Sequence, residues 1–205
     1  MSGSWEVRLS GRGGQGIIFI GIVLAEAAVA DGLNVVQSQV YGPESRGGAS
    51  KAEVIISAES ISYPKVSRPD VVLVMSQEAA DKYARTVKEG GLLVADSTHV
   101  RQLPAVKAKV IERPISGTAR DQLGREQVAS AVAAGLLAGL TGMVKTQALR
   151  DAIAARAPKG TVDLNLRALE AGLRLASEGV EEKRFAGRDS EPLPDRPEAS
   201  QGGGR

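Results

Sequence analysis

The sequence predicts an α/β protein with an open, doubly wound, mostly parallel sheet, the architecture usually called Rossmann-like. Short segments rich in valine, isoleucine and leucine alternate with helical segments along the chain, as in successive β-α-β units. A glycine-rich turn separates the first strand from the first helix. Hydrophobic residues make up 42% of the 205 residues and aromatic residues only 3%, so the core is expected to be aliphatic and rich in alanine.

The first half of the chain alternates strands with helices. Residues 6–10 alternate as a half-buried strand does, and after the glycine turn a long apolar segment, 17–30, is typical of a helix that ends at Asp31-Gly32. A second helix is predicted at 77–88, before Gly90-Gly91. Further strands are expected at 35–40, 52–57, 71–75, 92–95 and, more weakly, 110–111.

The second half is predicted to be helical and to end in a disordered tail. Helices are expected at about 126–140, 146–155 and 163–178, and the first of them is apolar almost all round, so it should be buried against this sheet or another subunit. We therefore expect one folded domain, 1–179. The tail 180–205 is rich in charge, proline and glycine and is expected to be disordered unless a partner orders it.

The composition excludes several functions. The chain has no cysteine, which removes disulfides, thiolate nucleophiles and cysteine-ligated iron–sulfur clusters, and its single histidine, His99, cannot supply a histidine metal cluster. A formal charge of +2 gives only weak attraction to a polyanion, so no nucleic-acid partner is indicated. No apolar run reaches the roughly 20 residues that span a bilayer, and the N-terminus does not resemble a signal peptide. We expect a cytoplasmic protein with no membrane contact.

The glycine turn is the first candidate site. Gly11, Gly13 and Gly16 have G-x-G-x-x-G spacing between a strand and a helix, where glycines allow close backbone approach and the helix start favours an anion such as a pyrophosphate. Dinucleotide binding also needs a carboxylate at the end of the second strand, but that strand ends in Gln37-Ser38-Gln39. Ordinary NAD binding is therefore disfavoured but stays open, beside a tight turn without a ligand and a turn close to a phosphate-bearing ligand or a partner subunit.

The second candidate site is the segment 41–50, which follows the second strand. In a doubly wound sheet it should lie at the carboxyl edge beside the glycine turn, where such folds bind ligands. Arg46 can donate two hydrogen bonds to a phosphate or carboxylate, and Gly47-Gly48 lets the backbone approach a neighbour. The alternative is a surface loop in which Arg46 is solvated or paired with Glu44.

Six motifs in the same order closely resemble the gamma subunit of the 2-oxoacid:ferredoxin oxidoreductases, especially the 2-oxoglutarate type. The resemblance covers roughly residues 6–176, and the combination is specific although no single motif is. The motifs are SGRGGQG at 10–16, YGPESRGGAS at 41–50, ISYPKV at 61–66, MSQEA at 75–79, GG at 90–91 followed by DS at 96–97, and RAPKGT at 156–161.

The resemblance implies a subunit that is inactive alone. In that family, thiamine diphosphate and the main catalytic groups reside on alpha and beta chains, and iron–sulfur clusters on a beta or ferredoxin-like delta chain, so those chains are the expected partners. The enzyme converts a 2-oxoacid and coenzyme A to acyl-CoA and CO₂ and passes electrons to ferredoxin or NAD. The resemblance also suggests that this domain lies near the coenzyme A site and the subunit interface. The expected contact residues are Gly11, Gly13, Gly14, Gln15 and Gly16, with Arg46 as charged anchor and Ser45, Gly47, Gly48 and, more weakly, Ser50 beside it.

No catalytic or metal-binding residues are expected on this chain. Asp96, Ser97 and His99 invite comparison with a catalytic triad, but residues crowded into one loop seldom converge in that way. Lys159-Gly160-Thr161 lacks the preceding strand and glycine of a P-loop, so a turn before a helix is the simpler interpretation.

Two other functions stay open at this point. One is the gamma subunit of an aryl 2-oxoacid enzyme, such as a phenylglyoxylate or indolepyruvate oxidoreductase. The other is a free-standing nucleotide-binding module with a regulatory role. The same glycine-rich segments would also serve if they packed only against partner chains without touching coenzyme A.

Overall fold

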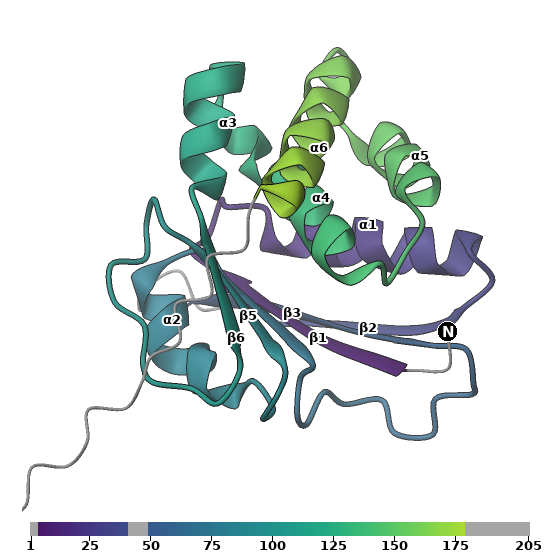
Figure 1. Ribbon diagram of the computed structural model, residues 1–205. Helices are drawn as coiled ribbons and strands as arrows, with labels where there is room; N and C mark the ends of the chain where they lie inside the picture. The colour runs from purple at the N-terminus through teal and green to yellow at the C-terminus, as the bar shows by residue number, and fades with distance from the viewer. Residues whose placement is uncertain (1–3, 41–48, 179–205) are drawn as a thin grey trace, which may run out of the picture.

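The computed structural model describes residues 4–40 and 49–178, which form a six-stranded sheet with helices on both faces (Figure 1). The strands are β1 (Ser4–Gly11), β2 (Asn34–Val40), β3 (Ser50–Ser57), β4 (Val71–Val74), β5 (Leu92–Asp96) and β6 (Lys109–Arg113). The α-helices are α1 (Ile17–Ala30), α2 (Gln77–Tyr83), α3 (Ile115–Leu123), α4 (Ala129–Thr141), α5 (Thr146–Arg156) and α6 (Val162–Ser177). Two 3₁₀ turns, η2 (Ala84–Thr86) and η3 (Glu126–Val128), extend α2 and precede α4.

The sheet order is β2-β3-β1-β4-β5-β6, so the chain winds outwards from β1 in both directions. Strands β1, β4, β5 and β6 pair in parallel, whereas β3 is antiparallel to both β1 and β2. The expected doubly wound, mostly parallel sheet is therefore confirmed, with one antiparallel strand inserted between β1 and β2. The carboxyl ends of β1, β4, β5 and β6 share one edge of the sheet.

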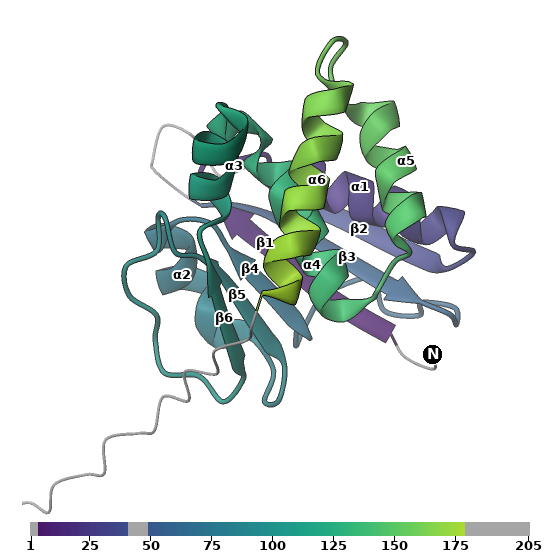
Figure 2. The same cartoon turned by 45° about the horizontal axis from the view of Figure 1, so that its top comes forward.

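The two faces of the sheet have cores of different size. On one face, α1 and α4 cover the larger aliphatic core, and α5 and α6 pack on the outer side of that layer (Figures 1 and 2). On the other face, α2 and η2 cover a smaller core that includes Val72, Val74 and Leu93. Because neighbouring residues of a buried strand point to opposite faces, Val71 and Leu73 of the same strand enter the larger core.

Helix α4 is buried by this chain itself, chiefly by α6, which lies alongside it. Glycines make this close packing possible. A Cβ atom added at Gly172 would lie 2.0 Å from the carbonyl oxygen of Val132, and one added at Gly135 would lie 2.3 Å from that of Leu169. The backbones of α4 and α6 therefore approach more closely than any side chain at these positions would allow. Helix α4 is thus covered by this chain's own helix α6, and its burial does not require another subunit.

The expected elements agree with the structure in all but two places. Helix α3 was missed, because it begins with Ile115-Ser116-Gly117-Thr118, which contains poor helix formers. The segment 77–88 was expected to be one helix, but the α-helix ends at Tyr83 and a 3₁₀ turn follows. The expected tail 180–205 lies outside the described residues. Among the described residues, no helix is long and apolar enough to cross a membrane.

Candidate functional site

The glycine turn lies at the carboxyl edge of the sheet, between β1 and β4, where the winding direction reverses. The backbone N–H of Met75, which follows β4, donates to the carbonyl of Ser10 at 2.9 Å, so the two strand ends are joined. In doubly wound folds, this switch point is the usual place for a ligand. The structure thus places the predicted glycine residues at the position where doubly wound folds usually bind a ligand.

The side chain of Gln15 locks the turn to the neighbouring strand end. Its Oε1 accepts a hydrogen bond from the backbone N–H of Arg12 at 2.6 Å, and its Nε2 donates to the carbonyl of Met75 at 2.8 Å. The guanidinium of Arg12 lies 3.3 Å from Glu78 in an exposed ion pair, which adds little stability. The backbone N–H of Gln15 also donates to the carbonyl of Arg12 at 3.2 Å. The amide and backbone of Gln15 therefore hold the shape of the turn.

The glycines of the turn divide into two kinds. A Cβ at Gly11 would lie 2.7 Å from Gln15 Oε1, and one at Gly16 would lie 2.7 Å from the Cβ of Ser130 in α4, so these two positions have internal packing reasons to be glycine. Gly13 and Gly14 have no heavy atom within 4 Å of an added Cβ. Gly14 also has a φ of +85°, whereas Gly13 has an ordinary backbone conformation. Packing within the described chain thus does not account for glycine at position 13.

Among the described residues, no carboxylate caps the start of helix α1 at this edge, unlike the starts of α2 and α3. Ser76 caps α2, since its Oγ accepts the N–H of Ala79 at 3.2 Å, and Glu78 lies in the first turn. The pKa of Glu78 is lowered, mainly because its carboxylate accepts a backbone hydrogen bond at the helix start and also one from Ser76, with Arg12 adding a smaller effect. Helix α1 has no side-chain cap and no acidic residue in its first turn. Its positive dipole end is thus left for an external anion or for a partner.

Asp96 serves α3 in the same way, so it is not part of a catalytic triad. Its fully buried carboxylate accepts the backbone N–H of Ser116 at 3.2 Å and that of Thr98 at 3.1 Å. His99 turns away to Glu126, with Nε2 2.7 Å from Oε1. Among the described residues, no cluster of three or more histidine and acidic side chains has a metal-binding arrangement.

The predicted residues Ser45, Arg46, Gly47 and Gly48 lie outside the described residues. The strands on both sides of the segment 41–48 are described, and they end beside the glycine turn. Ser50, the first residue of β3, is opposite Gly11 in the antiparallel register, and its carbonyl accepts a hydrogen bond from Ser10 Oγ at 2.9 Å. The described end of β2 and the described start of β3 therefore lie at the edge where the glycine turn lies.

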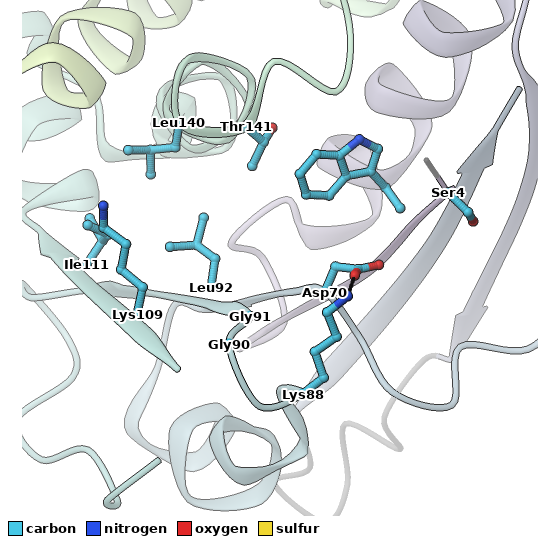
Figure 3. A pocket seen from close by; sticks show the side chains of 11 residues that line it. Ser4, Asp70, Lys88, Gly90, Gly91, Leu92, Lys109, Ile111, Leu140 and Thr141 are labelled. Atoms are coloured by element: carbon cyan, nitrogen blue, oxygen red, sulfur yellow. Dashed lines mark hydrogen bonds and ion pairs between the residues drawn. The ribbon is translucent and has the colours of Figure 1, made fainter. Parts of the chain in front are cut away.

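A cavity of about 630 Å³ lies at the opposite edge, against the amino ends of β4, β5 and β6 (Figure 3). Its apolar wall includes Trp5, Leu92 and Leu140. Asp70 and Lys88, which both line the cavity, form an ion pair with each other. The carboxylate of Asp70 also accepts a hydrogen bond from the backbone N–H of Glu6 at 2.6 Å. Since ligands of doubly wound sheets bind at carboxyl ends, size alone does not make this cavity the functional site.

The fold and the site together define a class of protein: a doubly wound domain whose carboxyl edge carries a glycine-rich turn and the start of a helix. The described residues hold neither a nucleophile paired with a base nor a metal cluster at that edge.

Comparisons with known proteins agree with this class. The profile of the family described as "Pyruvate ferredoxin/flavodoxin oxidoreductase" matches residues 6–175. The 2-oxoglutarate synthase subunit KorC of Methanocaldococcus jannaschii is 43% identical over 176 residues, which cover 84% of this chain and 94% of that protein. The crystal structure of the gamma subunit of a keto/oxoacid ferredoxin oxidoreductase from Geobacter sulfurreducens has a TM-score of 0.77 and 44% identity, covering 85% of this chain and 99% of that one.

A longer chain contains the same fold. The 2-oxoglutarate:ferredoxin oxidoreductase of Magnetococcus marinus, solved with 2-oxoglutarate, coenzyme A and succinyl-CoA bound, has a TM-score of 0.74. The match covers 86% of this chain and 32% of that one at 24% identity, and it shows the fold alone.

The chain belongs to the pyruvate ferredoxin/flavodoxin oxidoreductase family. It is a gamma-type subunit of a multi-subunit 2-oxoacid oxidoreductase, because relatives of that type align with it over nearly their whole length. The resemblance read from the six sequence motifs is confirmed.

Proposed function

We propose that the chain is the gamma subunit of an oxidoreductase that converts 2-oxoglutarate and coenzyme A to succinyl-CoA and CO₂. We also propose that its glycine turn contributes to the coenzyme A site. The substrate is supported by the 43% identity to a 2-oxoglutarate synthase subunit. The thiamine diphosphate and the iron–sulfur clusters are assigned to partner alpha, beta and delta chains, since this chain has no cysteine to hold a cluster. Ferredoxin is the proposed electron acceptor.

The observation that carries the proposal is the open space above Gly13 and Gly14 beside the uncapped start of α1. A phosphate group there would lie near backbone N–H groups of the turn and the positive end of a helix. Arg46 is proposed as the charged anchor from the adjacent segment, with Ser45, Gly47 and Gly48 beside it. A partner chain without coenzyme A is the alternative neighbour.

Alanine substitutions in the turn separate the two kinds of glycine. We expect Gly13→Ala to leave the melting temperature of the full chain unchanged, because the added Cβ meets no heavy atom of the described residues. In the assembled enzyme, it should raise the apparent Michaelis constant for coenzyme A. Gly16→Ala should lower the melting temperature by several degrees, since its φ of +72° and the contact with Ser130 together cost about 1–3 kcal/mol.

Thermal denaturation of the full chain and coenzyme A titration of the complex check this pair. If Gly13→Ala left both coenzyme A kinetics and subunit assembly unchanged, neither coenzyme A nor a partner chain would lie close to the glycine turn. The proposed role of the turn would then fail.

The isolated chain should be inactive, and activity should require its partners. We expect no oxidation of 2-oxoglutarate by the purified chain with a dye acceptor, and no binding of thiamine diphosphate, because its described residues contain no catalytic constellation. Purification of the native complex, identification of its chains and the same assay supply the positive control. Measurable turnover by the isolated chain would contradict the proposal.

A further inference from the structure

A second pocket, of about 600 Å³, opens next to the glycine turn but is formed by different elements. Phe19 lies in the first turn of α1, Ser130 in the first turn of α4, and Leu164 in the first turn of α6. Its volume is in the range of small-molecule sites. First-turn residues of three helices of 13 residues or more thus line the pocket, and the start of a helix carries the positive end of its dipole.

The charges around the pocket favour an anion. Arg125 lines it and makes no ion pair with any residue of 4–40 or 49–178. None of the lining residues within 4–40 and 49–178 is acidic. The two nearest carboxylates in sequence contact other side chains: Glu126 Oε1 lies 2.7 Å from His99 Nε2, and Asp163 lies 3.2 Å from Arg167.

A serine side chain supplies an independent indication of a ligand. Ser130 is only 5% exposed and lines the pocket, yet its Oγ has no hydrogen-bond partner within the described part of the chain. A serine in a helix commonly donates to the carbonyl four residues earlier, but no such bond forms here. The Oγ atom still reaches the pocket, because it is not one of the fully buried atoms without a partner in the described residues, and an oxyanion in the pocket would accept its hydrogen bond.

We propose that this pocket binds a phosphate group, held by Arg125 and Ser130 at the junction of the three helix starts. The walls formed by Phe19, Val128 and Leu164 indicate that the phosphate belongs to an organic molecule with an apolar or planar part. This assignment does not depend on the glycine turn, because none of Gly11, Gly13 and Gly14 lines the pocket.

Titration with inorganic phosphate tests the site. The ³¹P line width of phosphate is followed as the full chain is added at constant ionic strength, for the parent and for Arg125→Gln, Ser130→Ala and Arg85→Gln. Arg85 is an exposed arginine of η2 on the other face of the sheet and serves as the matched control. Arg125→Gln should weaken phosphate binding about tenfold or more, Ser130→Ala should weaken it by a smaller factor, and Arg85→Gln should have no effect.

The result that overturns the proposal is the same affinity in all four proteins, or no broadening with any of them. Both substitutions at the pocket are expected to leave the fold intact, because Arg125 is exposed and Ser130→Ala removes only one oxygen. An unchanged melting temperature verifies this.

Competition identifies the source of the phosphate. In the complete complex, coenzyme A that displaces inorganic phosphate would make its phosphates the ligand. Failure to displace phosphate, with the Arg125 effect retained, would mean a separate phosphate compound. The second outcome would support this phosphate site even if the glycine turn were shown to have no role in coenzyme A binding.

Discussion

Gly172→Ala should strongly destabilise the protein, although the same change stabilises an ordinary helix by about 1 kcal/mol. The reason is that the new Cβ would lie 2.0 Å from the carbonyl oxygen of Val132 and 2.8 Å from the backbone nitrogen of Leu136. These are backbone atoms of α4, so no side-chain rotation relieves the contact and the helices must separate. Overpacking of this kind costs about 3 kcal/mol or more, a large fraction of the roughly 5–15 kcal/mol that holds a domain folded.

Thermal denaturation should show this as a melting temperature lower by about 6–12 °C or more. Gly135→Ala should behave in the same way, because its Cβ would lie 2.3 Å from the carbonyl of Leu169. Gly13→Ala is the control for the chemical change itself, since its Cβ meets open space. Parent-like melting of Gly172→Ala would contradict the close packing of α4 on α6.

Arg46→Ala should raise the apparent Michaelis constant of the assembled enzyme for coenzyme A about tenfold to hundredfold. This range corresponds to the roughly 1.5–3 kcal/mol of a charge-assisted hydrogen bond. The constant for the 2-oxoacid should change much less. Arg46→Lys should restore only part of the loss, because lysine cannot make the planar, two-pronged contact.

Separate titrations of coenzyme A and 2-oxoacid on the intact mutant complex measure this difference. Arg85→Ala is the control for the loss of one positive charge. If Arg46 serves only the subunit interface, the complex should dissociate on dilution, while the surviving complex keeps parent kinetics for coenzyme A. A stable complex with an unchanged constant would remove Arg46 from the site.

The fold could largely be predicted because its strands and helices have strong local patterns. The apolar segment 17–30 coincides with α1, and the buried strands were found within one or two residues. Helix α3 was missed because its start depends on Asp96, which caps it from another element. The antiparallel direction of β3 was readable in principle: the connection 41–49 is shorter than the dozen or more residues that a parallel crossover needs.

The candidate site could be predicted only in part. The spacing of the glycines placed the turn correctly at the carboxyl edge, but it could not separate glycines that pack internally from those that face open space. Gly16 is explained by Ser130, which is far away in the sequence. The phosphate pocket was not predicted at all, because Arg125 and Ser130 follow the helix that was missed and belong to no motif.

The cavity at the amino edge contains the only tryptophan of the chain, Trp5. Indole emission responds to the polarity of its surroundings, so intrinsic fluorescence observes this end of the sheet and not the glycine turn. The emission should change when β1 separates from its neighbouring strands, or when Leu140 and Thr141 at the end of α4 move relative to Trp5. A change in emission on adding coenzyme A or phosphate would therefore report a rearrangement transmitted along the strands, and not contact with the ligand.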